Sequence, residues 1–239
     1  MDIIPIVPQN YFNEGIFRNF GIGCCYEDST LEQHIGCEIN IETAHSKMEQ
    51  TSEANIEKFE KLDEWKLDSL IEYMVTNYHK SAKDNIITIY DLAEKISFKH
   101  GAKHPELQKL TAFLFLLFDD LLSHFKMEED ILFKNILQLL ELPKASDLTT
   151  NSGFWSIKKS ITAMKKDHEA TFKDLRFLRV LTSNYMIPVD GCVSYKFLFE
   201  IMRQFEDDLI RHICIENNIL FVKAIELDEK VEEQKLQVL

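Results

Sequence analysis

The sequence predicts an all-α protein: an antiparallel up-down four-helix bundle preceded by a small helical N-terminal domain. The 239 residues include only 7 glycines and 5 prolines, and long stretches lack both, which favours helices over strands and turns. Four long segments place apolar residues at steps of three and four, the period of an amphipathic helix. Short connections make successive helices antiparallel neighbours, so the four segments predict a bundle.

Residues 1–50 are predicted to form the small N-terminal domain. A short helix is expected to precede Cys24 and Cys25, which follow a glycine and lie in a turn. Residues 30–33, Thr-Leu-Glu-Gln, fit a capping box that opens another short helix. Residues 51–61 hold few apolar side chains and are expected to form a linker.

The bundle is predicted over residues 62–228, and residues 229–239 are expected to form a charged tail. Gly101 suits the C-terminal end of the first helix, and Pro105 suits the first turn of the second. Pro143 ends the second helix, because proline cannot continue it. The four expected helices cover residues 62–99, 105–142, 154–185 and 193–227.

One ten-residue pattern, H-x-x-x-E-x-x-I-L-F, occurs twice, beginning at His124 and at His212. Residues four apart lie on one face of a helix, so His124 and Glu128 point the same way, as do His212 and Glu216. Both pairs continue the apolar stripe of their helix and therefore face the core. Buried ionisable groups require an opposite charge or a metal, so two facing pairs predict a metal centre.

Each copy of the pattern also has one histidine upstream on a predicted helix. His79 extends the apolar stripe of the first helix, and His168 extends that of the third. A single core histidine is usually a hydrogen-bonded core residue, but six ionisable residues at matched helical phase and in duplicate favour a metal site. The first two helices form one predicted hairpin and the last two form another. Together the two hairpins supply the donors of a dinuclear centre.

The predicted donors are imidazoles and carboxylates, a set that suits iron, manganese or zinc. The twofold repeat leads us to expect that His79 and His124 bind one metal, and that His168 and His212 bind the other. Both glutamates would then bridge the two metals, with one position left open for a small molecule. Two further histidines, His100 and His104, lie at the first interhelical turn. They could line an approach to the metal centre or be ordinary loop residues, and both interpretations remain open.

The composition excludes several other classes of protein. A net charge of −13 argues against nucleic acid or an anionic membrane as the main partner. No apolar run approaches the roughly 20 residues of a membrane-spanning helix, and the N-terminus has no basic segment typical of a signal peptide. Five cysteines with two adjacent do not match a secreted disulfide framework. We therefore expect a cytoplasmic protein.

Several shorter motifs accompany the repeated pattern. They are Gly23-Cys24-Cys25 with Thr30-Leu31, Tyr78-His79, His100-Gly101, Asp167-His168-Glu169, Pro188 with Cys192-x-x-Tyr195, and Glu216-Asn217-Asn218. In combination these residues resemble the iron–sulfur cluster repair di-iron proteins, a bacterial family with a hemerythrin-like domain. The resemblance covers nearly the whole chain.

The resemblance implies a non-haem centre of two iron ions, oxo- and carboxylate-bridged, in a hemerythrin-like bundle. It implies repair of iron–sulfur clusters damaged by nitrosative or oxidative stress, by donation of iron. The implied partners are iron–sulfur proteins as clients, nitric oxide or oxygen as small ligands, and an electron donor. Cys24 and Cys25 would act in redox or iron transfer, with two partly buried structural thiols as the alternative.

Three other functions remain open at this point. They are a nitric oxide or oxygen sensor or carrier, a di-iron reductase of nitric oxide or peroxide, and a metal-free helical scaffold. The second carboxylate makes the ligand set more anionic, which stabilises ferric iron and favours redox chemistry or iron release over oxygen storage. We therefore prefer an iron donor over a conventional enzyme. The oligomeric state stays open, and a homodimer is compatible with the sequence.

Overall fold

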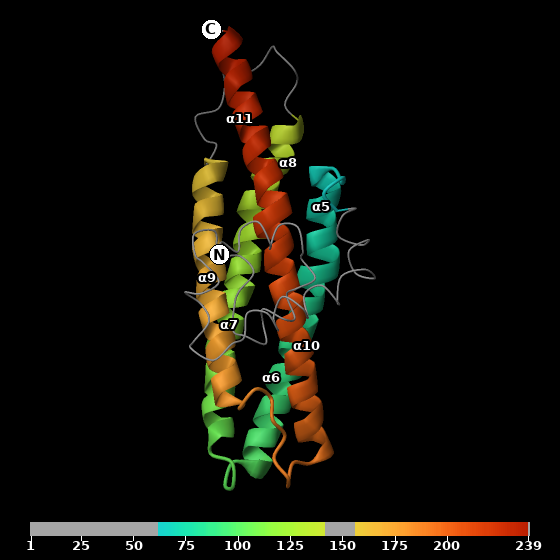
Figure 1. Ribbon diagram of the computed structural model, residues 1–239, viewed down its shortest axis with the longest axis vertical. Helices are drawn as coiled ribbons and strands as arrows, with labels where there is room; N and C mark the ends of the chain where they lie inside the picture. The colour runs from blue at the N-terminus through green and yellow to red at the C-terminus, as the bar shows by residue number, and fades with distance from the viewer. Residues whose placement is uncertain (1–61, 142–155, 239) are drawn as a thin grey trace, which may run out of the picture.

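The computed structural model describes residues 62–141 and 156–238. Every regular element in these two ranges is helical, and four long helical rods pack side by side in alternating directions (Figure 1). The predicted all-α bundle is confirmed. The predicted N-terminal domain, with Cys24 and Cys25, and the linker lie outside the described residues. None of the described helices is long and apolar enough to cross a membrane.

Three of the four rods are built from two α-helices joined by a π-helical turn. The first rod comprises α5 (Leu67–Tyr73), η2 (Met74–His79) and α6 (Lys80–His100). The second comprises α7 (Glu106–Met127), η3 (Glu128–Leu132) and α8 (Phe133–Glu141). The third is the single helix α9 (Ile157–Leu181). The fourth comprises α10 (Val193–Ile215), η4 (Glu216–Leu220) and α11 (Phe221–Val238).

The third rod is shorter than residues 154–185, the range expected from the sequence. At its start the Ser156 hydroxyl accepts a hydrogen bond from the backbone N–H of Lys159, as an N-cap does. At its end three successive residues have φ of 49°, 57° and 60°, a left-handed conformation that an α-helix of L-residues excludes. They are Ser183, Asn184 and Tyr185.

The fourth rod is longer than expected, because α11 continues through the segment predicted as a charged tail. Half-buried Val231 packs against the apolar cluster at this end of the bundle, and the ammonium of Lys158 lies 3.1 Å from the carboxylate of Glu229. The apolar stripe therefore extends past Leu227 among the charged residues.

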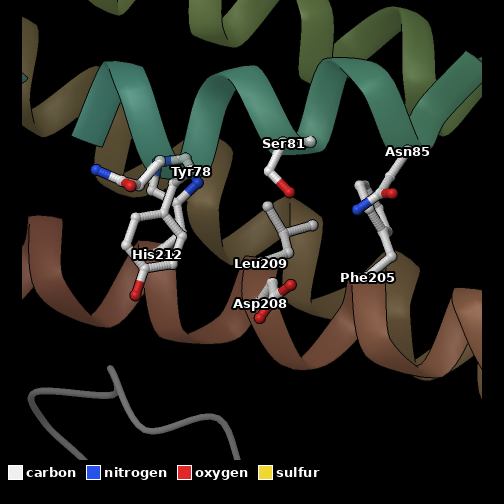
Figure 2. A pocket seen from close by; sticks show the side chains of 9 residues that line it. Tyr78, Ser81, Asn85, Phe205, Asp208, Leu209 and His212 are labelled. Atoms are coloured by element: carbon white, nitrogen blue, oxygen red, sulfur yellow. The ribbon is translucent and has the colours of Figure 1, made fainter. Parts of the chain in front are cut away.

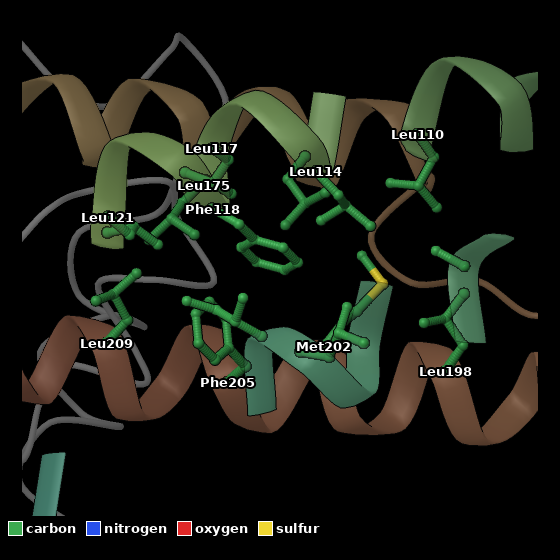
Figure 3. Close-up of a cluster of buried hydrophobic side chains, with 14 of the residues drawn as sticks. Leu110, Leu114, Leu117, Phe118, Leu121, Leu175, Leu198, Met202, Phe205 and Leu209 are labelled. Carbon is green, nitrogen blue, oxygen red and sulfur yellow. The ribbon is translucent and has the colours of Figure 1, made fainter. Parts of the chain in front are cut away.

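Two apolar clusters hold the rods together, one on each side of the predicted ligands. The larger cluster lies between α6, α7, α9 and α10 (Figure 3). The smaller cluster lies between α5, α8, α11 and the start of α9. Burying one large aliphatic or aromatic side chain contributes about 1.5–3 kcal/mol, so each cluster fixes its end of the bundle. The layer between them is thus held in place from both sides.

Candidate metal centre

The six predicted ligands meet in the layer between the two apolar clusters. Glu128, Glu216 and His79 have no exposed surface, and the three other histidines are buried. Each rod contributes at least one of these side chains. The six residues are His79, His124, Glu128, His168, His212 and Glu216.

The six side chains form two overlapping groups of four, and the two glutamates belong to both. One group adds His79 and His212, the other adds His124 and His168, and within each group the ligand atoms lie within 4.8 Å of one another. The Nε2 atoms of His79 and His212 are 3.1 Å apart, and those of His124 and His168 are 3.0 Å apart.

Each glutamate presents one carboxylate oxygen to each group. Oε2 of Glu128 lies 3.4 Å from Nε2 of His79, and its Oε1 lies 3.4 Å from Nε2 of His124. Oε1 of Glu216 lies 2.8 Å from Nε2 of His212, and its Oε2 lies 3.3 Å from Nε2 of His168. This is the geometry of two carboxylates that bridge a pair of cations.

The pairing of histidines expected from the sequence is wrong. His79 was expected to share a metal with His124, and His168 with His212, but the structure pairs each histidine of one hairpin with a histidine of the other. The reason is the packing at the level of the ligands, where η2, which carries His79, packs against α10, and η3 packs against α9. The twofold repeat is compatible with both pairings, so the repeat alone could not distinguish them.

π-Helical turns lie at the ligands of three rods, where the sequence predicted uninterrupted α-helices. The backbone N–H of Phe133 bonds to the carbonyl of Glu128, five residues back, and that of Phe221 bonds to the carbonyl of Glu216. The repeated pattern is therefore one α turn, from histidine to glutamate, followed by one π turn, from glutamate to phenylalanine. Such turns are frequent at functional sites.

Several polar atoms of this layer have no hydrogen-bond partner among the described residues, although they are buried. They are both carboxylate oxygens of Glu128, Oε2 of Glu216 and Nδ1 of His124. Unpaired buried oxygens are costly and rare. Burial and repulsion from Glu216 raise the pKa of Glu128 well above its usual range, whereas a cation between the carboxylates would stabilise their charge. The donor set therefore fits two metal ions.

Two histidines of this layer, His124 and His212, favour the neutral form that binds metals. Burial, followed by repulsion from His168, lowers the pKa of His124 to about 3. Burial also lowers the pKa of His212. At neutral pH each of these two rings keeps a nitrogen lone pair, which metal coordination requires.

Hydrogen bonds behind two histidines fix the orientation of their rings. Nδ1 of His79 lies 2.8 Å from the carboxylate of Glu129, which also accepts a hydrogen bond of 2.7 Å from Lys83. Nδ1 of His168 lies 2.9 Å from Oδ1 of Asn217. Such partners leave Nε2 free for a metal and raise its basicity.

The supporting shell goes beyond the residues that the sequence predicted as ligands. Glu129 directly follows the predicted ligand Glu128, and its hydrogen bond with His79 makes it a support of the candidate site. Asn217 and Lys83 were missed as supports, and the signal for Asn217 is its place directly after the glutamate of the repeated pattern. Lys83 lies one helical turn beyond His79 on an exposed stripe and gave no signal.

His100 and His104 do not line an approach to this layer. His100 ends α6, which begins directly after His79. His100 therefore lies about 30 Å from His79 along the helix, at 1.5 Å per residue. Nε2 of His100 lies 3.1 Å from the thiol of Cys192, and His104 bonds to Asp190 and Glu106. Both join the first interhelical turn to the loop before α10.

A helical bundle whose interior holds four histidines and two bridging carboxylates belongs to the class of di-metal carboxylate proteins. Residues 70–224, which include all six of these side chains, match the sequence model of the hemerythrin HHE cation binding domain. The chain belongs to this family.

Curated relatives agree over nearly the full length of the chain. An iron-sulfur cluster repair protein YtfE of Enterobacter sp. (strain 638) is 26% identical over 215 residues, 88% of this chain and 90% of the relative. A probable iron-sulfur cluster repair protein of Haemophilus influenzae is 26% identical over 218 residues, with the same coverage. An iron-sulfur cluster repair protein ScdA of Staphylococcus epidermidis is 26% identical over 227 residues, 93% of this chain and 97% of the relative. The resemblance expected from the sequence is confirmed.

Proposed function

We propose that this protein repairs iron–sulfur clusters damaged by nitrosative or oxidative stress by donating iron from a di-iron centre. The observation that carries the proposal is the pair of buried glutamates, each with one oxygen toward each histidine pair. The names of the relatives, which match about nine-tenths of the chain, supply the client class. The clients would be iron–sulfur proteins of the cytoplasm.

The metal ions in this proposal are iron, held by the four histidines and two glutamates. Imidazole and carboxylate donors without thiolate suit iron in either common oxidation state. Iron would supply one-electron chemistry, affinity for nitric oxide or oxygen, and the ion that a damaged cluster lacks. An electron donor would return the centre to the ferrous state, the more weakly held form with an anionic ligand set.

The protein's own residues have three tasks in this function. Glu128 and Glu216 each turn one oxygen toward each histidine pair and would hold two ions, so a centre that had donated one ion would keep ligands for the other. The bond from Glu129 holds His79 in position. Phenylalanine rings exclude water, because Phe125 stacks on His79 at 4.6 Å and Phe221 stacks on His168 at 5.8 Å.

Cys24 and Cys25 complete the proposal as a redox or iron-transfer pair. Adjacent thiols can hold an iron ion or pass electrons when their pKa is low enough to form thiolate. Replacing both by serine should leave the iron content of the bundle unchanged and slow iron delivery to a client.

The proposal is tested by metal content together with a repair assay. Protein purified without added metal should contain iron at about two ions per chain and restore activity to a nitric-oxide-treated hydratase that depends on an iron–sulfur cluster. His212→Ala should lose iron and repair together, whereas His104→Ala, at the other end of the bundle, should keep both. Normal iron content without repair would refute the function and leave the di-iron centre in place, and zinc in place of iron would refute both.

A pocket beside the centre favours a second candidate, a nitric oxide or oxygen sensor, carrier or reductase. It has a volume of ≈ 200 Å³, lies between the first and fourth rods, and reaches His212 (Figure 2). Ala82 lies in its lining. Ala82→Leu should slow the binding of nitric oxide to the ferrous protein, and Ala82→Ser should not. Steady turnover of nitric oxide or peroxide with an electron donor would favour a reductase over a repair protein.

A further inference from the structure

A row of aromatic side chains runs from the protein surface to the candidate metal centre. The ring of Trp65 lies edge-on to that of Tyr73 at 5.4 Å, and Tyr73 lies edge-on to Tyr78 at 5.7 Å. Tyr78 then stacks on His212 at 5.6 Å (Figure 2). Trp65 is 39% exposed and His212 is buried, so three steps between adjacent rings join solvent to a proposed ligand.

The members of this row differ chemically from the other aromatic residues around the site. Phe125 and Phe133 stack on His79, and Phe221 stacks on His168. Phenylalanine is not oxidised under biological conditions, whereas tryptophan and tyrosine lose one electron readily. Packing alone would be served equally well by phenylalanine at the two tyrosine positions. Among the described rings stacked on the four histidines, the oxidisable one is Tyr78.

The π-helical turn η2 is what aligns the two tyrosines. Tyr73 and Tyr78 are five residues apart, and in an α-helix such residues point about 140° away from each other. The wider π turn over Met74–His79 brings them onto one face in contact. The same turn carries His79, so ligand placement and tyrosine alignment depend on one local feature.

The surface end of the row is held in place by the last rod. The ammonium of Lys223 donates hydrogen bonds to the backbone carbonyls of Asp63 and Trp65. The backbone N–H of Trp65 donates to the carbonyl of Leu62 at 3.1 Å, and Leu62 is buried. Trp65 is therefore anchored, although part of its ring faces solvent.

We propose that this row carries single electrons inward from Trp65 to the metal centre. The inference rests on the proposed di-iron centre and adds a route by which the centre is reduced after peroxide has oxidised it above its ferric state. It also names the class of reductant, a small thiol in solution that meets the exposed edge of Trp65. The oxidant is hydrogen peroxide, which accepts two electrons at the centre.

The electrons and protons balance over two passages. On giving an electron to the centre, Tyr78 releases its hydroxyl proton to water in the pocket that it lines, and it takes a proton back when the electron of Tyr73 arrives. Tyr73 releases its own hydroxyl proton at that step and regains one in the next. Trp65 gives an electron to Tyr73 and releases its indole proton to water. A thiol then gives a hydrogen atom to Trp65, and two thiyl radicals combine. In total, one O–O and two S–H bonds break, one disulfide and two waters form, and the row is restored.

The first test needs no metal. In a Trp155→Phe background Trp65 is the one remaining tryptophan of the two in the sequence. Pulse radiolysis with the azide radical, which selectively oxidises indole, should show the tryptophan radical decaying as a tyrosyl radical appears, at a rate independent of protein concentration. Tyr73→Phe should abolish this conversion, and Tyr90→Phe, outside the row, should leave it intact. Unchanged conversion in Tyr73→Phe would overturn the proposal.

The second test uses the iron-loaded full chain after measurement of its metal content. Peroxide without thiol should produce a tyrosyl signal in electron paramagnetic resonance and oxidised Trp65 in peptide mass spectrometry. Tyr78→Phe should lose both and show oxidation of residues around the ligands. Equal oxidation of Trp65 in Tyr78→Phe would mean direct attack from solution and would overturn the proposal. Absence of iron would refute the proposed function. The first test would then decide separately whether electrons pass between the side chains of the row.

Discussion

At the scale of single residues, the bridging glutamates explain why so much polarity is buried in this layer. Two fully buried carboxylates repel each other, and this repulsion together with burial raises the pKa of Glu128. Burial lowers the pKa of His124 and of His212, so these two rings add no positive charge beside Glu128 at neutral pH. Two cations between the histidine pairs would satisfy the orphaned oxygens and the free nitrogen lone pairs together.

The pairing of the histidines can be tested by counting metal ions in double variants. His79→Ala with His212→Ala removes both histidines of one position and should leave about one ion per chain, because the other position keeps two histidines and two carboxylates. His79→Ala with His124→Ala takes one histidine from each position and should weaken both. Elemental analysis with a competing chelator measures the difference. The opposite order would support the pairing expected from the sequence.

The burial of all six residues in one layer could be predicted from the sequence, because each is an ionisable residue on an apolar stripe. The pairing of the histidines could not, since each rod packs against two others and the chain order of His79, His124, His168 and His212 allows both arrangements. Asn217 was missed as a support, because an amide after a glutamate fits an exposed position equally well. Its bond to His168 appears only when the third and fourth rods pack.

At the scale of elements, the π turn η3 shows where helical periodicity fails as a guide. A regular α-helix would place Ile131, three residues after Glu128, on the core-facing stripe, but Ile131 is only half-buried. Leu132 and Phe133 are buried in its place. The π turn absorbs one extra residue, so the apolar faces before and after it remain in register. The period was therefore informative on both sides of the turn and misleading within it.

Deleting one residue inside a π turn should be tolerated by the fold and not by the metal site. Without the exposed Asp130, η3 can close as an α turn with α7 and α8 still in register, so the free energy of unfolding of the metal-free protein should change by less than about 1 kcal/mol. Metal affinity should fall about 10–100-fold, because Glu128 and Glu129 both lie in this turn. Urea denaturation and metal competition measure the two effects.

Deletion of Asp119 is the matched control, since this exposed residue lies within the regular helix α7. There the following residues would rotate by about 100° and move Leu121 and Phe125 off the core, which should cost more than about 3 kcal/mol. Equal destabilisation by the two deletions would contradict the role assigned to the π turn.

The far end of the bundle should show its own pH dependence. Burial alone would lower the pKa of His104, but hydrogen bonds with Asp190 and Glu106 outweigh it and raise the pKa. A raised pKa means that this contact stabilises the fold fully below about pH 6.5 and that the stabilisation is lost as pH rises through the folded-state value. Asp190→Asn should lower the pKa of His104 measured by NMR, and Asp91→Asn, at an exposed site, should not. An unchanged titration in Asp190→Asn would remove this contact as the cause.

At the scale of the whole molecule, the layer of candidate ligands separates the two apolar clusters of one bundle. The bundle could be predicted because few glycines and prolines interrupt four amphipathic segments. The C-terminal end of the third rod could not be predicted, since it depends on three residues with left-handed backbone conformation that no local sequence pattern required. Glu206 helps to fix this corner, because its carboxylate accepts hydrogen bonds from Arg179 and from the hydroxyl of Tyr185.

Metal binding should stabilise the whole bundle, because the six ligands come from all four rods. The two apolar clusters contain none of the six proposed ligands, so the chelated protein should keep its helical circular dichroism and still unfold cooperatively. A ligand that binds only the folded state stabilises it by about 1.4 kcal/mol for each tenfold rise in its free concentration above Kd. The unfolding temperature, measured anaerobically, should therefore rise steadily with the concentration of buffered ferrous iron.

The His79→Ala, His212→Ala double variant should show a weaker dependence on iron concentration, because it keeps one metal position. A chelated protein with the same unfolding temperature as the iron-loaded one would mean that the ions do not join the rods.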